Sequence, residues 1–221
     1  MKESLKYFLE RTTPFGTLAR FQRERRLENK LHQWEENGAV PPMPHLGKHR
    51  VVIEYIKRFS IDIFIETGTY KGKMVYTIIP HVKEIYSIEL DETHFQNAQE
   101  RFAGYPNIHI LQGQSGEVLP KVLKDIDKPC LFWLDAHWSG GFSAKGEFET
   151  PVMQELPCVL NHIKADEHVI LIDDARCFTG ENDYPALKML KQFILDVHPG
   201  WIFEVKDDII RIYFDKSKRR S

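Results

Sequence analysis

Short apolar runs alternate with amphipathic segments along most of the chain after residue 60. Apolar runs bounded by polar or turn residues predict buried strands, and apolar residues at helical spacing predict helices. The predicted strands cover residues 61–66, 84–90, 107–113, 130–135, 168–173 and two runs within 201–214. The predicted helices cover residues 73–80, 91–104, 115–125, 150–164 and 184–198. Strands that alternate with helices in this way form a parallel sheet with helices on both faces.

The last two predicted strands follow each other with only a short polar segment, Lys206 to Asp208, between their apolar residues. A turn this short joins antiparallel neighbours, so the last strand runs against the one before it. We therefore predict an α/β protein with a Rossmann-like, doubly wound, mostly parallel sheet of seven strands. The last strand of this sheet is antiparallel. An N-terminal helical extension precedes the whole sheet.

Residues 1–45 differ from the rest of the chain. A charged segment carries apolar residues at helical spacing, and prolines and glycines interrupt it from residue 38 onwards. The apolar positions of this predicted helix are Leu18, Phe21, Leu27, Leu31 and Trp34. The helix either packs on the core or forms a lid or dimerisation element. We predict a helical extension at 1–45, a main domain at 46–215 and a basic tail at 216–221.

Composition narrows the class of protein. The formal net charge of −2 and the isoelectric point near 6.6 give no basic field that favours nucleic acid or an anionic membrane. No apolar run approaches the roughly 20 residues that span a bilayer. Cys130, Cys158 and Cys177 are widely spaced and form no C-x-x-C pair, which predicts reduced thiols and a cytoplasmic location. A homo-oligomer is compatible with these features.

Glu66 ends the first predicted strand, and Gly68 and Gly72 follow it. Gly68 permits a tight turn, and Gly72 permits a close approach of backbone to a ligand. Glu89 ends the second strand, 23 residues after Glu66, and a carboxylate at this position can accept both hydroxyls of a ribose. The glycine spacing differs from the dinucleotide and triphosphate motifs, and an acid here suits a ligand with an amino group. The alternative is that both acids are solvated strand ends.

The order E-T-G-T-Y-K-G, then S-I-E-L, then L-Q-G-Q-S resembles the class I S-adenosylmethionine-dependent methyltransferases over roughly residues 60–214. The resemblance implies that 46–215 is an S-adenosylmethionine-binding methyltransferase domain. The cofactor-binding residues that it implies are Glu66, Gly68, Thr69, Gly72, Glu89, Gln114, Ser115 and Asp135. Within this set, Glu66 and Gly68 would lie by the methionine part and Glu89 by the ribose. Gln114 and Ser115 would line the adenine.

Three further acids follow the fourth and fifth predicted strands. Neighbouring parallel strands lie about 4.8 Å apart, so the side chains of Asp135, Asp173 and Asp174 are expected to converge. Clustered carboxylates repel one another unless a proton or cation lies between them, and oxygen ligands suit Mg²⁺, with Mn²⁺ or Ca²⁺ as alternatives. The arrangement is similar to metal-dependent O-methyltransferases of the catechol type and of the sugar- and antibiotic-modifying branch, which implies that these acids are metal ligands. Alternatively, they cap helices and contact the cofactor without a metal.

His137 lies two residues after Asp135. The sugar- and antibiotic-modifying branch tends to carry its proton acceptor just after this aspartate, so the likeness implies that Asp135 and His137 are catalytic. A histidine titrates near neutrality and can take a proton from a hydroxyl group. His137 can instead be a metal ligand or pack against Trp138. The glycine-containing loop 138–150 is placed to close over a substrate; the alternative is that it only connects two elements.

The leading functional hypothesis is an S-adenosylmethionine-dependent O-methyltransferase, dependent on a divalent metal ion such as Mg²⁺ and acting on a hydroxyl of a small molecule or sugar. One alternative is a metal-independent RNA or protein methyltransferase, which two basic clusters, R-F-Q-R-E-R-R and K-S-K-R-R, support slightly. Another is a cofactor-binding subunit without catalysis, which fold alone does not exclude. The D-A-H-W sequence after the fourth strand differs from the D/N-P-P-Y/F motif of amino-group methyltransferases of nucleic acids, which makes a nucleic-acid substrate less favoured.

Overall fold

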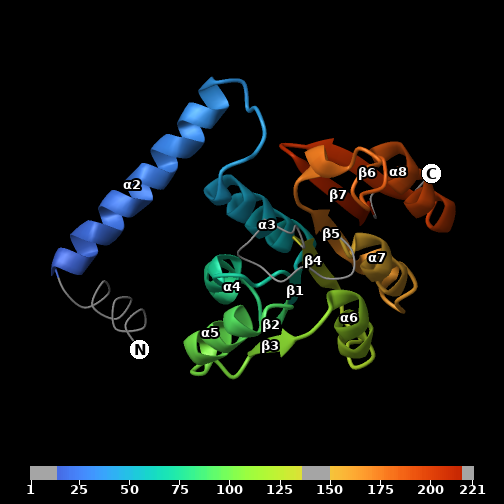
Figure 1. Cartoon of the computed structure of the whole chain (residues 1–221), viewed down its shortest axis with the longest axis horizontal. Coiled ribbons are helices and arrows are strands. Elements are labelled where there is room, and N and C mark those ends of the chain that lie inside the picture. The colour runs from blue at the N-terminus through green and yellow to red at the C-terminus, as the bar shows by residue number, and fades with distance from the viewer. Residues whose placement is uncertain (1–13, 136–149, 216–221) are drawn as a thin grey trace. The chain divides into compact units, whose positions relative to one another are not determined.

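The structure is a computed structural model that describes residues 14–135 and 150–215 (Figure 1). The chain divides into two compact units, Met1–Arg50 and Val51–Ser221. The domain boundaries predicted at residues 45 and 215 stay predictions. The predicted basic tail at 216–221 lies outside the described residues.

The first unit contains the predicted N-terminal helix, α2 (Pro14–Glu36), and the start of α3 (His45–Phe59). At the end of α2, Leu31 is buried and lies near Gly47, while the indole nitrogen of Trp34 donates a hydrogen bond to the carbonyl oxygen of Val40. The predicted apolar stripe is therefore buried near its end. Its other members, Leu18, Phe21 and Leu27, are exposed.

The second unit contains a seven-stranded sheet in the order β3-β2-β1-β4-β5-β7-β6. The strands are β1 (Ile63–Thr67), β2 (Glu84–Glu89), β3 (Ile108–Gln112), β4 (Cys130–Leu134), β5 (Val169–Ile172), β6 (Trp201–Lys206) and β7 (Ile209–Phe214). The strands β3, β2, β1, β4 and β5 pair in parallel, and β7 is antiparallel to both β5 and β6. The predicted fold class is confirmed, including the antiparallel last strand.

Helices connect the strands at the predicted positions. The α-helices of this unit, besides the end of α3, are α4 (Lys73–Ile78), α5 (Glu92–Phe102), α6 (Ser115–Leu123), α7 (Val152–Leu160) and α8 (Leu187–Val197). The short 3₁₀ helices are η1 (Ile79–His81), η2 (Ala165–Glu167) and η3 (Ala175–Cys177). Within the described residues, no helix is long and apolar enough to cross a membrane.

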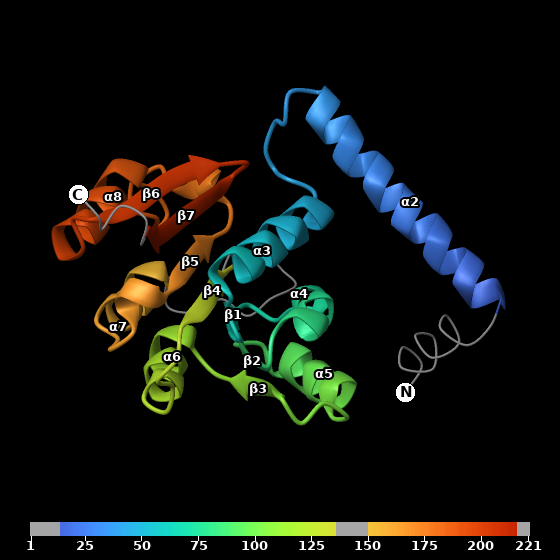
Figure 2. The same cartoon turned by 180° about the vertical axis from the view of Figure 1, so that it is seen from behind.

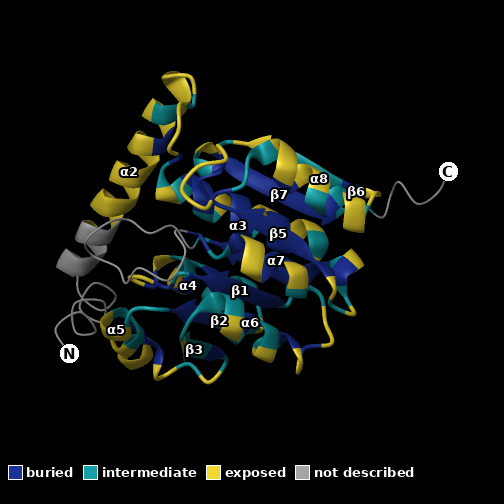
Figure 3. Ribbon diagram, turned by 45° about the vertical axis from the view of Figure 1, so that its right-hand side comes forward, coloured by how far each residue is buried: buried dark blue, intermediate teal, exposed yellow. Residues whose placement is uncertain are grey.

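The core lies between the sheet and the helices on its two faces. Figures 1 and 2 show α6, α7 and α8 on one face, and α4 and α5 on the other. Strand residues alternate between these faces. Ile63 and Ile65 of β1 pack in the same cluster as Leu119 of α6, Leu156 of α7 and Ile194 of α8. The central strands β1, β4 and β5 are accordingly buried along their whole length, whereas the edge strands β3 and β6 are mostly partly exposed (Figure 3).

Strand register brings the predicted site residues to one edge of the sheet. Glu66 is the partner of Ser87 on β2, and Glu89 is the partner of Gln112 on β3. On the other side, Leu134, the last residue of β4, is the partner of Ile172, the last residue of β5. Because parallel strands end at the same edge, the residues that follow β1 to β5 lie along this carboxyl edge, where open α/β sheets bind ligands.

Candidate cofactor and metal site

The glycine turn between β1 and α4 uses backbone conformations that favour glycine. Gly68 has a φ of 95° and Gly72 a φ of 63°, both in the left-handed region. A Cβ atom on Gly72 would lie 2.7 Å from the ring of Phe102, so the helix α5 packs directly against this backbone. Both glycines are therefore required by geometry, and they shape the turn at the carboxyl end of β1.

Glu66 is buried behind this turn. Only 1% of its surface is exposed, and its Oε1 atom accepts a hydrogen bond from the hydroxyl of Ser87 at 2.5 Å. The Ser87 oxygen also lies 2.5 Å from the hydroxyl of Thr69, which must then be the donor of that second bond. Burial raises the pKa of Glu66 to about 8, with Ser87 lowering it and Glu89 raising it. Glu66 is thus a proton-holding group that is well placed to gain a cationic partner.

Glu89 connects the glycine turn to the end of β2. Its Oε2 atom accepts from the backbone N–H of Tyr70 at 2.6 Å, and its Oε1 atom accepts from the backbone N–H of Asp91 at 2.9 Å. The residue is 5% exposed. A carboxylate has about four acceptor positions, so two remain for the hydroxyls of a ligand. The two backbone bonds fix the direction in which this carboxylate faces.

Gln114 and Ser115 lie beside Glu89. The backbone N–H of Gly113 donates to the carbonyl oxygen of Glu89 at 2.9 Å, which ties the loop after β3 to the end of β2. Gln114 takes the N-cap position of α6, and Ser115 is the first residue of that helix. The structure therefore places Gln114 and Ser115 directly after β3, next to the strand that ends in Glu89, and their role at the adenine stays a prediction.

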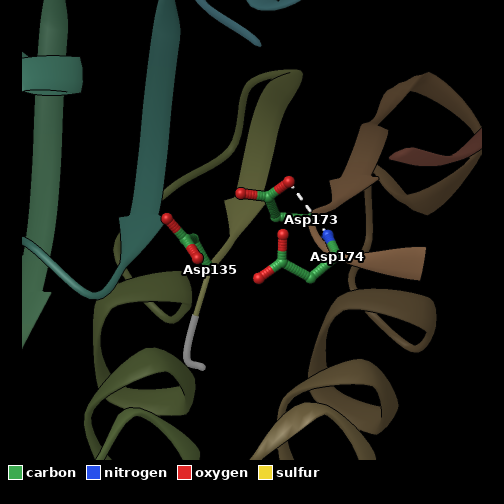
Figure 4. A group of neighbouring side chains, drawn as sticks. All are labelled: Asp135, Asp173 and Asp174. Atoms are coloured by element: carbon green, nitrogen blue, oxygen red, sulfur yellow. Dashed lines mark hydrogen bonds between the residues drawn. The ribbon is translucent and has the colours of Figure 1, made fainter. Parts of the chain in front are cut away.

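The three predicted aspartates also converge (Figure 4). One oxygen of each of Asp135, Asp173 and Asp174 lies within 4.8 Å of the others. The backbone N–H of Asp135 donates to the carbonyl oxygen of Thr67, and that of Asp173 donates to the carbonyl oxygen of Leu134, both at 3.1 Å. These bonds extend the ladder past the strand ends. Asp135 therefore follows β4 beside the end of β1, and Asp173 follows β5 beside the end of β4.

Asp174 has an unusual backbone and a charged partner. Its φ of 56° lies in the left-handed region, and its N–H donates to Oδ1 of Asp173 at 2.9 Å. Its Oδ1 atom accepts from the guanidinium of Arg176 at 2.8 Å. Three carboxylates with oxygens this close form a donor set that suits a hard divalent ion such as Mg²⁺ or Mn²⁺. One of them, Asp174, already pairs with the guanidinium of Arg176.

His137, the predicted base, lies outside the described residues, and so does most of the loop 138–150. The residues described at this edge therefore include those predicted to bind the cofactor and the metal, and the prediction for His137 stays a prediction.

The sequence pattern missed one buried acid near this edge. Glu155 of α7 is fully buried, and neither of its oxygens has a hydrogen-bond partner among the residues that the structure describes. The hydroxyl of Thr67 is also buried and unpartnered there. Burial raises the pKa of Glu155 to about 7, which the neighbouring Ser115 and Thr67 lower only in part. In the sequence, Glu155 is one polar position of an amphipathic helix, so no local signal distinguishes it.

No protein-family model matches the sequence, and a search of curated proteins finds no match. Solved structures do match the fold. A methyltransferase from Podospora anserina, PaMTH1, bound to S-adenosylhomocysteine, has a TM-score of 0.52 at 13% identity, over 82% of each chain. The O-methyltransferase TomG from Streptomyces achromogenes, which functions in tomaymycin synthesis and is in complex with S-adenosylmethionine, has a TM-score of 0.51 at 14% identity, over 84% of this chain and 87% of that one.

A protein from Klebsiella pneumoniae that is described as an O-methyltransferase has a TM-score of 0.51 at 17% identity, over 84% of this chain and 87% of that one. These likenesses show that the chain has the fold of S-adenosylmethionine-dependent methyltransferases, including O-methyltransferases. The fold that the sequence resemblance predicted is therefore confirmed.

Proposed function

We propose that this protein is an S-adenosylmethionine-dependent O-methyltransferase that uses a divalent metal ion and acts on a hydroxyl group of a small molecule or sugar. One observation carries the proposal. A single edge of a methyltransferase-type sheet gathers Glu66, Glu89 and the three aspartates Asp135, Asp173 and Asp174. A cofactor site and a metal site side by side are what a metal-assisted methyl transfer requires.

The geometry supports S-adenosylmethionine as the cofactor. Glu66 is a buried acid without an ion pair in the described part of the chain, and it suits the amino group of the methionine part. Glu89, fixed by two backbone N–H groups, suits the two hydroxyls of the ribose. Gly68, Thr69 and Gly72 form the turn whose backbone would contact the cofactor. Gln114 and Ser115 would line the adenine.

Asp135, Asp173 and Asp174 would hold the metal ion, and Asp135 would also contact the cofactor. A bound divalent ion would lower the pKa of the acceptor hydroxyl, as it does for water. The protein's part in the reaction is to fix the two reactants in line and to remove the proton. We assign proton removal to His137, which follows Asp135 by two residues in the sequence, because of the resemblance to the sugar- and antibiotic-modifying branch. The three free cysteines favour a cytoplasmic location.

Methyl transfer from labelled S-adenosylmethionine tests the proposal. Sugars, phenols, RNA and a protein mixture would be offered as acceptors, each with Mg²⁺ and with EDTA. We expect transfer to a hydroxylated small molecule that EDTA abolishes and Mg²⁺ restores. EDTA-resistant transfer to RNA or protein would support the metal-independent alternative. Cofactor binding without transfer to any acceptor would support the non-catalytic subunit.

A further inference from the structure

Arg176 joins two carboxylates that are far apart in the sequence. Its Nη1 atom donates to Oδ1 of Asp174 at 2.8 Å and also to Oδ2 of Asp208, in the turn between β6 and β7. Its backbone N–H donates to Oδ1 of Asp208 at 2.9 Å. The neighbouring backbone N–H of Ala175 donates to the carbonyl oxygen of Asp208 at 2.8 Å. The turn after β5 and the β6–β7 turn are therefore fastened together around one guanidinium.

The charges in this bridge are held in a partly buried place. The side chain of Asp208 is 1% exposed, that of Asp174 is 10% exposed and that of Arg176 is 38% exposed. Burial works to lower the pKa of Arg176, but the bonds and charges of Asp174 and Asp208 together raise it. Arg176 therefore stays charged, and its positively charged guanidinium contacts Asp174, one of the three clustered aspartates.

A divalent ion and Arg176 would both be attracted to Asp174. The two cations repel each other, so an ion at the cluster weakens the hold of Asp174 on the guanidinium. Arg176 does not then lose all of its compensation, because the buried carboxylate of Asp208 still binds it. An arginine has five N–H donors, so Arg176 can weaken its bond to Asp174 while it keeps its bonds to Asp208.

We propose that Arg176 is a positioning residue that holds Asp174 while the metal is absent and sets the affinity of the cluster for the ion. Asp208 is the carboxylate that retains Arg176 when the ion takes Asp174. The inference rests on the proposed metal site and adds to it a pair of residues, Arg176 and Asp208, that tune the site without binding the ion.

Mn²⁺ binding to the full-length protein tests this inference, with free Mn²⁺ followed by electron paramagnetic resonance. Arg176→Gln removes the competing charge, so the affinity for Mn²⁺ should rise about tenfold. Asp208→Asn removes the alternative carboxylate, so Arg176 depends more on Asp174 and the affinity should fall about tenfold. The amide oxygen of an asparagine can still accept from the backbone N–H of Arg176, which preserves the turn.

Asp207→Asn is the matched control, because Asp207 lies in the same turn with a φ of 56° but pairs with Arg211. Its affinity for Mn²⁺ should equal that of the wild type. Arg176→Lys keeps the charge and should also stay close to the wild type, which separates the effect of the charge from that of side-chain shape. If Arg176→Gln does not fold, Arg176→Met removes the charge in its place. Shifts of Arg176→Gln and Asp208→Asn in the same direction, or no shift in either, would overturn the inference. A wild-type protein that binds no Mn²⁺ would overturn the proposed metal site as well.

Discussion

The hydroxyl of Ser87 donates a hydrogen bond to Glu66, with the two oxygens 2.5 Å apart, and this bond joins the ends of β2 and β1. Burial raises the pKa of Glu66 to about 8, and the Ser87 bond is the factor that lowers it. Glu66 is therefore largely protonated at pH 7. A cationic amino group binds the ionised form better, so cofactor affinity should increase as the pH rises from about 6 to 7.5, a range in which an α-amino group is still largely protonated.

Ser87→Ala should raise the pKa of Glu66 further, because the charged form loses a hydrogen bond. The affinity for S-adenosylmethionine at pH 7.5 should fall by a factor on the order of three to ten. Calorimetric titration at several pH values measures both effects, with Thr93→Ala, at an exposed position on α5, as the control. A wild-type affinity that is independent of pH would show that Glu66 does not hold the amino group.

Glu89→Ala should weaken S-adenosylmethionine binding roughly ten- to a hundredfold, because about 1.5–3 kcal/mol is lost with a charge-assisted hydrogen bond. The variant also releases the backbone N–H groups of Tyr70 and Asp91, which loosens the glycine turn. Glu84→Ala is the matched control, since Glu84 begins the same strand at the opposite edge. Equal loss of affinity in both variants would contradict the assignment of Glu89 to the ribose.

Much of this site was predictable from local patterns. A strand that ends in an acid places that acid at the carboxyl edge, and parallel strands share this edge, so Glu66, Glu89 and Asp173 could be assigned together. The contact between Ser87 and Glu66 could not, because it depends on the register between β1 and β2. The bridge from Arg176 to Asp208 spans 32 residues and depends on how the β6–β7 turn packs. No periodicity in the sequence reports such a contact.

The metal site makes a separate prediction about stability. Mg²⁺ or Mn²⁺ should raise the melting temperature of the wild type, because the ion binds the native cluster and not the unfolded chain. Asp173→Asn combined with Asp174→Asn removes two of the three carboxylates and should abolish this rise, with cofactor affinity largely unchanged. Differential scanning calorimetry with and without millimolar metal measures the effect. Asp207→Asn should keep the full rise. A wild-type melting temperature that neither Mg²⁺ nor Mn²⁺ changes would contradict the metal site.

His137→Ala should lower kcat by roughly 10² to 10⁴, because a general base contributes about this factor. Affinities for the cofactor and for Mg²⁺ should barely change. The activity of the wild type should also fall on acidification, as an imidazole with an ordinary pKa of about 6.5 takes up its proton. Steady-state kinetics between pH 5.5 and 8.5 would test both points. A variant that keeps kcat but loses metal affinity would make His137 a ligand instead.

Glu155 makes the stability of the fold depend on pH. Its folded pKa of about 7 lies above the ordinary value of 4.5, chiefly because of burial. Between pH 4.5 and 7 the folded state therefore keeps a proton that the unfolded state releases. The contribution of protonated Glu155 to the free energy of unfolding is complete below about pH 4.5 and is lost as the pH rises through 7. Each unit of difference corresponds to about 1.4 kcal/mol, which gives an effect on the order of 3 kcal/mol.

Glu155→Gln keeps the shape of the side chain and removes the titration. With EDTA present, the variant should gain stability relative to the wild type as the pH rises from 5 to 8, by an amount on the order of 3 kcal/mol. Urea unfolding at each pH measures the difference. Glu117→Gln, an exposed position in the first turn of α6, should show almost no such trend. A constant difference between Glu155→Gln and the wild type across this range would mean that Glu155 does not hold a proton in the folded protein, which would contradict the raised pKa.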